Sequence, residues 1–182
     1  MKDSTKNNVR FMVLSAMFIA LGVVLPIAFH TVPNAGPTFL PMFIPVLLGA
    51  LFLPWQFALA VGIITPLLSS LLTGMPPMAP RPMFLMMAAE LGVASVVLSL
   101  MKNIKLLQKR KYFIDLALVP ALILGKIANL AVLLIAIPIL GLPEVGMWAY
   151  ISGSFATGIP GIIILAVLLP LIYSLIKRRQ AA

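Results

Sequence analysis

Long apolar runs alternate with short polar segments along this chain. A helix needs about 17–25 apolar residues to cross roughly 30 Å of hydrocarbon at 1.5 Å per residue. The runs predict six such helices, at residues 11–29, 39–53, 56–72, 83–101, 114–139 and 155–176. The second and third are separated only by a short segment around Pro54. The pattern predicts an all-α integral membrane protein, in which residues 1–182 form a single membrane domain, a compact bundle of six transmembrane helices.

The basic side chains gather at the chain ends and between two of the apolar runs. Of 13 Lys and Arg residues, eleven fall in three segments: Lys2, Lys6, Arg10; Lys102, Lys105, Lys109, Arg110, Lys111; Lys177, Arg178 and Arg179. Six spans place all three segments on one side of the membrane, and short loops rich in Lys and Arg face the cytoplasm. An odd number of spans would separate the two basic termini. We therefore expect a multi-pass protein of the bacterial plasma membrane with both termini cytoplasmic.

The composition narrows the class of protein further. With 62% hydrophobic and 9% charged residues, the chain has too little polar material for a soluble surface. The net charge of +9 then indicates how the chain is oriented in the membrane and that it is attracted to the anionic lipid of the inner leaflet. It does not indicate nucleic-acid binding, which would need a soluble basic face. There is no cysteine and only one histidine, so we expect neither a metal site nor catalytic residues. The chain is not expected to be an enzyme.

The segments expected on the outer side differ from the basic inner ones. They are rich in proline and glycine, and their candidate ligand-binding side chains are His30 and Asn34 in 30–38, Arg81 in 73–82, and Trp148 and Tyr150 in 140–154. Proline fixes φ and cannot continue a helix, so we expect shaped caps. Non-helical backbone near membrane depth is tolerated where it lines a wet cavity, which favours an outward-facing pocket. Prolines that merely end helices, an Arg81 that only anchors its helix and a His30 that only caps one would fit the same pattern.

Three polar residues interrupt the fourth and fifth predicted helices. Glu90 lies about seven residues, or 10 Å, below the outer start of its helix, and Lys126 about twelve residues, or 18 Å, from the inner start of the next. Asn129 follows Lys126 by three residues and lies on nearly the same face. A charge inside a membrane is costly unless it is paired or hydrated. The depths predict that Glu90 and Lys126 can meet, either as a pair that fixes helix packing or as the floor of a polar substrate site.

Three stretches carry a resemblance to a known family. They are Ala16-x-x-x-Ala20, Phe39-Leu40-Pro41-Met42-Phe43-Ile44-Pro45-Val46-Leu47-Leu48-Gly49 and Thr65-Pro66-Leu67-Leu68-Ser69-Ser70-Leu71-Leu72-Thr73-Gly74-Met75-Pro76-Pro77. With the six predicted helices and the length, the chain resembles the substrate-binding S component of energy-coupling factor (ECF) vitamin transporters. At Phe43 it departs from relatives that often have histidine, which puts any polar role at that position in doubt.

The resemblance implies a function and a set of partners. An S component captures a vitamin on the outer side, while a transmembrane T component and two cytoplasmic ATPases supply the energy. Ala16 and Ala20 then correspond to the family's contact with the T component, and the three outer segments to its lid and pocket. No Walker-type G-x-x-x-x-G-K-[ST] occurs in the chain, which fits a division of labour in which partners use ATP. No covalently bound cofactor is expected.

The substrate and one competing class stay open at this stage. Cobalamin and a pyridoxine- or hydroxymethylpyrimidine-like compound are the nearest candidates within the family, and no residue separates them. A stand-alone secondary transporter of a small polar metabolite is the competing interpretation. It would require Glu90 to titrate during transport and would give uptake without an ATPase.

Overall fold

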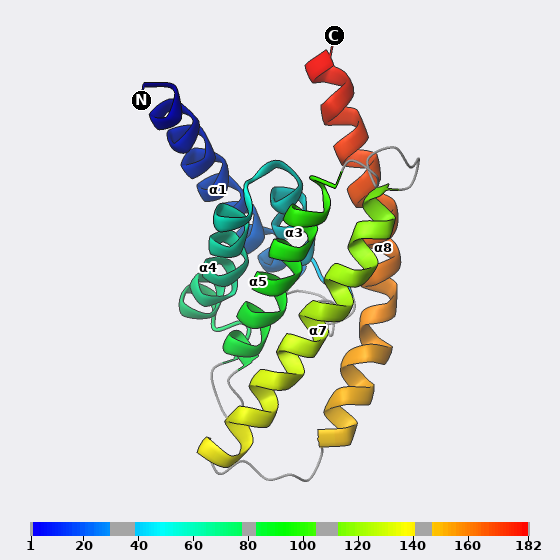
Figure 1. The fold of residues 1–182 in the computed structure, drawn as a ribbon. Helices are drawn as coiled ribbons and strands as arrows, with labels where there is room; N and C mark the ends of the chain where they lie inside the picture. Colours follow the sequence, from blue (N-terminus) through cyan, green and yellow to red (C-terminus); the bar gives the residue numbers. More distant parts are fainter. Residues whose placement is uncertain (1, 30–38, 78–82, 105–112, 141–146, 182) are drawn as a thin grey trace.

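Six helices make up the part of the chain that the computed structural model describes, which is residues 2–29, 39–77, 83–104, 113–140 and 147–181. They are α1 (Lys2–Phe29), α3 (Phe43–Phe52), α4 (Trp55–Thr73), α5 (Met83–Met101), α7 (Phe113–Leu140) and α8 (Met147–Ala181). Within those ranges there is no strand. Figure 1 shows the N-terminal end of α1 and the C-terminal end of α8 at the same end of the bundle.

Five of the helices are long and apolar enough to cross a membrane: α1, α4, α5, α7 and α8. The second apolar run, expected to span the membrane at 39–53, forms only the ten-residue α3. That helix is about 15 Å long, half of the hydrocarbon thickness, so the prediction of a spanning helix there was wrong in length. The chain turns at Leu40, which has a φ of 49°, and α3 ends in the extended residue Leu53 before Pro54. These two breaks limit the helix.

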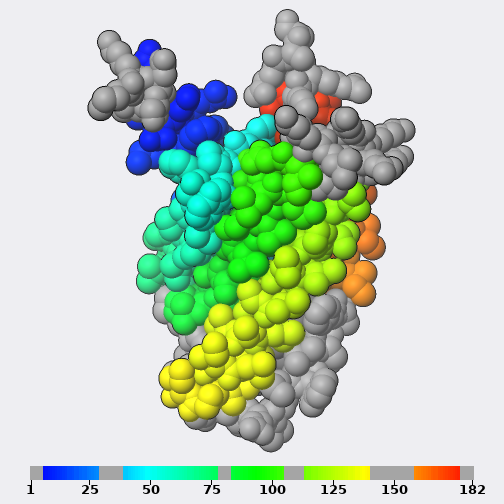
Figure 2. Space-filling model, viewed as in Figure 1, coloured from blue at the N-terminus to red at the C-terminus, as the bar shows by residue number. Residues whose placement is uncertain are grey.

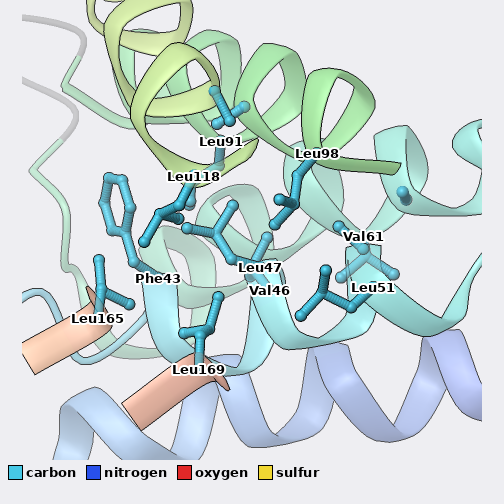
Figure 3. Packing of buried hydrophobic residues seen from close by; sticks show 14 of the residues in the cluster. Phe43, Val46, Leu47, Leu51, Val61, Leu91, Leu98, Leu118, Leu165 and Leu169 are labelled. Atoms are coloured by element: carbon cyan, nitrogen blue, oxygen red, sulfur yellow. The ribbon is translucent and has the colours of Figure 1, made fainter. Parts of the chain in front are cut away.

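The short helix α3 forms the centre of the apolar core. Seven of its ten residues are buried, and Val46, Leu47 and Ala50 are fully enclosed. Figure 3 shows the surrounding side chains arriving from α4, α5, α7 and α8: Val61, Leu91, Leu98, Leu118, Leu165 and Leu169. Phe43 also belongs to this core, with 3% of its surface exposed. A histidine there would need a hydrogen-bonding partner that an apolar cluster does not offer.

Helix α5 runs through the middle of the bundle, packed against α3, α4 and α7. Figure 2 shows α4, α5 and α7 side by side on one face of the molecule. Glycines permit the close approach of these helices. A Cβ atom on Gly62 of α4 would lie 2.8 Å from the Cα of Gly92 of α5. In lipid, where apolar surface alone does not drive helices together, close packing of small residues is a main source of association energy.

The last helix begins earlier than the sequence suggested. The segment 140–154 was expected to be a non-helical outer cap, but α8 already begins at Met147. Pro143 is the last proline before Pro160, so no proline interrupts a helix over the intervening residues. Trp148 and Tyr150 therefore lie on the first turns of a helix and not in a loop.

Candidate functional site

The candidate site is built where α5 and α7 approach each other closely, at Gly125. A Cβ atom on Gly125 of α7 would lie 2.7 Å from the backbone oxygen of Glu90 and 3.1 Å from the Cβ of Ala94, both on α5. Only glycine fits this approach without a shift of the helices. Because Lys126 and Asn129 follow Gly125 within about one turn, the contact places both side chains beside Glu90.

Glu90, Lys126 and Asn129 form a buried polar cluster, which we call the Glu90 cluster. Lys126 Nζ lies 2.7 Å from Glu90 Oε1. Asn129 Nδ2 donates a hydrogen bond of 2.6 Å to Glu90 Oε2. Each carboxylate oxygen therefore has a partner from α7. The sequence-based expectation that Glu90 and Lys126 can meet is confirmed.

The members of the Glu90 cluster differ in burial. Glu90 and Asn129 are 5% and 3% exposed, whereas the side chain of Lys126 keeps 20% of its surface accessible. A charged pair away from water is tolerated when the charges balance and the remaining hydrogen-bonding atoms are satisfied, conditions that the Glu90 carboxylate meets. Lys126 is therefore the member of the cluster with the most exposed side chain.

The other residues expected to bind substrate lie outside the part of the chain where side chains are described. His30, Asn34 and Arg81 fall in segments beyond the described residues. Trp148 and Tyr150 are placed only as positions on α8. Their role stays a prediction. Within the described ranges, no group of three His, Cys, Asp or Glu side chains is arranged to hold a metal ion.

Helix α1 presents two different faces made of small residues. Ala16 and Ala20 are exposed. Gly22 is buried against α4, where a Cβ atom would lie 2.5 Å from Cγ2 of Thr65. Since Ala20 and Gly22 are separated by about 200° around the helix axis, they serve opposite sides. The fold thus uses Gly22 for internal packing and leaves the Ala16–Ala20 pair available on the outside.

Lys102 has a role that the sequence did not reveal. The sequence placed Lys102 in a basic segment expected to face the cytoplasm. In the structure, its side chain points toward the C-terminal end of α3. There Nζ donates to the carbonyl oxygen of Ala50 at 2.9 Å and to that of Leu53. Ser99 Oγ also donates to the Leu53 oxygen, at 2.8 Å. A cation that satisfies the last carbonyls of a helix also complements its dipole. Burial lowers the pKa of Lys102 to about 8.

Only the order of residues along the chain could have indicated this contact of Lys102 with α3. Leu53-Pro54 ends a helix whose last carbonyls need donors, and Lys102 follows the apolar run of α5. Which donor would reach those carbonyls depends on the packing of α5 against α3, which no local pattern specifies.

Three hydroxyl groups make hydrogen bonds at the C-terminal end of α4. Ser69 Oγ donates to the carbonyl oxygen of Met75 at 2.7 Å, and Ser70 Oγ donates to that of Pro76 at 2.6 Å. Thr73 Oγ1 accepts from the backbone N–H of Met75 at 3.2 Å. Gly74 ends the helix in the left-handed conformation, with a φ of 71°. The segment that follows α4 is therefore held against the helix from which it emerges.

The fold and the Glu90 cluster together define a multi-pass helical membrane protein with a paired charge buried between two of its helices. A family model described as the substrate-specific component of ECF transporters matches residues 10–173, so the chain belongs to that family. The family is one of transporter components and not of enzymes. Comparisons with curated proteins and with solved structures gave no significant match.

Proposed function

We propose that this chain captures a water-soluble vitamin outside the cell and passes it inward, while partner subunits hydrolyse ATP. Membership of the substrate-specific family supports this function. The observation that carries it is the Glu90 cluster, because a buried charged pair inside a membrane bundle is costly and by default suggests a functional role. Cobalamin and a pyridoxine- or hydroxymethylpyrimidine-like compound are the proposed substrates.

The proposed binding site has a floor and a rim. Glu90, Lys126 and Asn129 form the floor between α5 and α7. The predicted outer residues His30, Asn34, Arg81, Trp148 and Tyr150 are proposed to form the rim. The hydroxyl contacts that hold Met75 and Pro76 support a shaped connection after α4.

The proposed partners are a transmembrane T component and two cytoplasmic ATPases. The exposed positions of Ala16 and Ala20 support a docking face on α1, since small residues let another helix approach closely in lipid. We also propose that both termini are cytoplasmic. The placement of the two ends of the chain at one end of the bundle supports this orientation, as does the concentration of basic residues there.

Two experiments test the proposed function. The protein is purified from cells grown in rich medium, and mass spectrometry of the released small molecules should identify a bound vitamin. In reconstituted vesicles, uptake should require the T component, the ATPases and ATP on their side of the membrane. Accumulation by the isolated chain on a proton or sodium gradient alone would favour a secondary transporter instead.

A further inference from the structure

The charge balance of the Glu90 cluster bears on the kind of substrate it accepts, an inference that rests on the proposed function. Glu90 and Lys126 are 2.7 Å apart and together carry no net charge. Away from the helix ends, the described parts of the spanning helices contain no other charged side chain. Asp115, also on α7, precedes Lys126 by eleven positions, about 16 Å along the helix axis. A charged ligand group held at the cluster would therefore have no counter-charge of its own among these residues, since Arg81 is proposed for the rim and not for this floor.

An anionic ligand could gain a counter-charge only by drawing Lys126 away from Glu90. Glu90 would then be a carboxylate with 5% of its surface exposed and only the Asn129 amide as its partner. Removing one partner of a buried ion pair is strongly destabilising, because it leaves an uncompensated charge. Binding energy gained at Lys126 would be offset by this loss at Glu90.

A cationic ligand meets the opposite difficulty. Lys126 is the most accessible member of the cluster, and its ammonium group would repel a second cation. The carboxylate that would attract such a ligand already accepts contacts on both of its oxygens, from Lys126 and Asn129. The cluster is therefore arranged against either sign of net charge.

We propose that the substrate held at the Glu90 cluster is an uncharged polar compound that presents a hydrogen-bond acceptor to Lys126. A lysine ammonium group can only donate, so the complementary group is a ring nitrogen, a carbonyl or a hydroxyl oxygen. Phosphorylated or carboxylated forms of the same compound are poor ligands at this position, since they add a charge that the cluster cannot balance.

The test uses pairs of vitamins that differ only in charge. The purified full chain in detergent is titrated with five pairs: pyridoxine and pyridoxine 5′-phosphate, hydroxymethylpyrimidine and its phosphate, riboflavin and its 5′-phosphate, pantothenol and pantothenate, and cyanocobalamin and its monocarboxylic acid. In the pair that binds, the uncharged member should bind roughly tenfold or more tightly than the anionic one, a difference of about 1.4 kcal/mol or more. Equal or tighter binding of the anionic member overturns the proposal.

A variant at Glu90 shows whether the cluster itself makes this selection. Glu90→Gln leaves the charge of Lys126 unbalanced, so the preference within that pair should shift by about tenfold or more toward the anionic member. Asp115→Asn also replaces a carboxylate by a carboxamide, but about 16 Å from Lys126 along α7, and it should leave the preference unaltered. An unaltered preference in folded Glu90→Gln would show that charge balance at Glu90 does not select the ligand.

A double variant covers the case in which Glu90→Gln does not fold. Glu90→Gln with Lys126→Met keeps the cluster uncharged, so any remaining binding should still favour the uncharged member, and a reversed preference would contradict the proposal. The outcomes distinguish the proposed substrate class from the proposed function of vitamin capture. Preference for an anion overturns the substrate class but leaves vitamin capture standing. Failure of the folded, ligand-free protein to bind any member of any pair counts against vitamin capture and, with it, the substrate class.

Discussion

Gly125 of α7 lies so close to Glu90 of α5 that a Cβ atom at Gly125 would stand 2.7 Å from the Glu90 backbone oxygen. This approach sets the separation of the two helices at the level of the Glu90 cluster. It allows the side chains of Lys126 and Asn129 to reach the two carboxylate oxygens at 2.7 Å and 2.6 Å. The polar cluster and the glycine contact are therefore parts of one arrangement.

Replacement of Gly125 by alanine should force α5 and α7 apart, because the added Cβ atom would lie 2.7 Å from the backbone oxygen of Glu90. We expect a loss of about 1–3 kcal/mol or more in the free energy of unfolding, the usual effect of overpacking a close contact. Thermal or denaturant unfolding in detergent measures it. Gly158→Ala is the matched control, because the nearest atom to a Cβ there is Leu40 Cδ1 at 4.0 Å. The control should be neutral or slightly stabilising, and equal losses in both variants would contradict this role for Gly125.

Separation of the charged pair should be more costly than its complete removal. Glu90→Gln or Lys126→Met alone should lower the free energy of unfolding by about 3–5 kcal/mol, through the buried charge left behind. The double variant should recover much of that loss. A double-mutant cycle of unfolding measurements gives the coupling energy. Additive losses would show that the pair does not act as a unit.

Substrate binding by the same double variant distinguishes a structural role from a functional one. If the Glu90 cluster forms the floor of the site, the folded double variant should bind the vitamin about tenfold or more weakly, equivalent to 1.4 kcal/mol. Unchanged affinity would restrict Glu90 and Lys126 to helix packing. Asp115→Asn again serves as the control for removal of a carboxylate elsewhere on α7.

Bulky side chains at Ala16 or Ala20 should prevent docking of the T component. Both positions are exposed, so Ala16→Trp or Ala20→Trp should leave the isolated protein folded and able to bind its vitamin. Uptake by cells and co-purification of the partners should fall strongly, because the close approach of a helix is blocked.

Two controls on the same helix separate docking from folding. Ala28→Trp changes an exposed alanine outside the motif and should preserve uptake. Gly22→Leu should disrupt the fold itself, since it clashes with Thr65 of α4. Normal uptake by the Ala16 and Ala20 variants would disprove the docking role.

Lys102 should make stability depend on pH in the alkaline range. Burial lowers its pKa from 10.5 to about 8 in the folded protein, so between these values the unfolded chain binds more protons than the folded one. The free energy of unfolding attributable to Lys102 therefore rises as pH increases from about 8 to about 10.5. A neutral amine still has two N–H groups for Ala50 and Leu53, so deprotonation does not require the loss of these contacts.

Comparison with Lys102→Met isolates this effect. Unfolding in detergent is measured at several pH values for both proteins, and other titrating groups cancel in the difference. The stability of the native protein relative to the variant should increase from pH 8 to 10. A difference that is flat or falls over this interval would show that Lys102 is not disfavoured as a cation in the fold.

Much of the fold could be predicted from the hydropathy pattern. Helix α5 has the expected bounds of 83–101, and α4 and α7 differ from expectation by one residue at each end. The reason is that lengths of apolar sequence bounded by proline, glycine or charge leave few choices for a backbone in lipid. The compatible depths of Glu90 and Lys126 also followed from counting residues along the helices.

The sequence by itself determined that this chain is a helical membrane protein with a charged residue on each of two neighbouring helices. Only the tertiary structure decided that α3 is a short helix enclosed by protein, that Lys102 points toward α3, and that Ala20 and Gly22 serve opposite faces. The hydropathy of a residue does not show whether it faces lipid or another helix, since both surroundings are apolar. Which face turns inward depends on where residues such as Gly22 and Gly125 let two backbones meet.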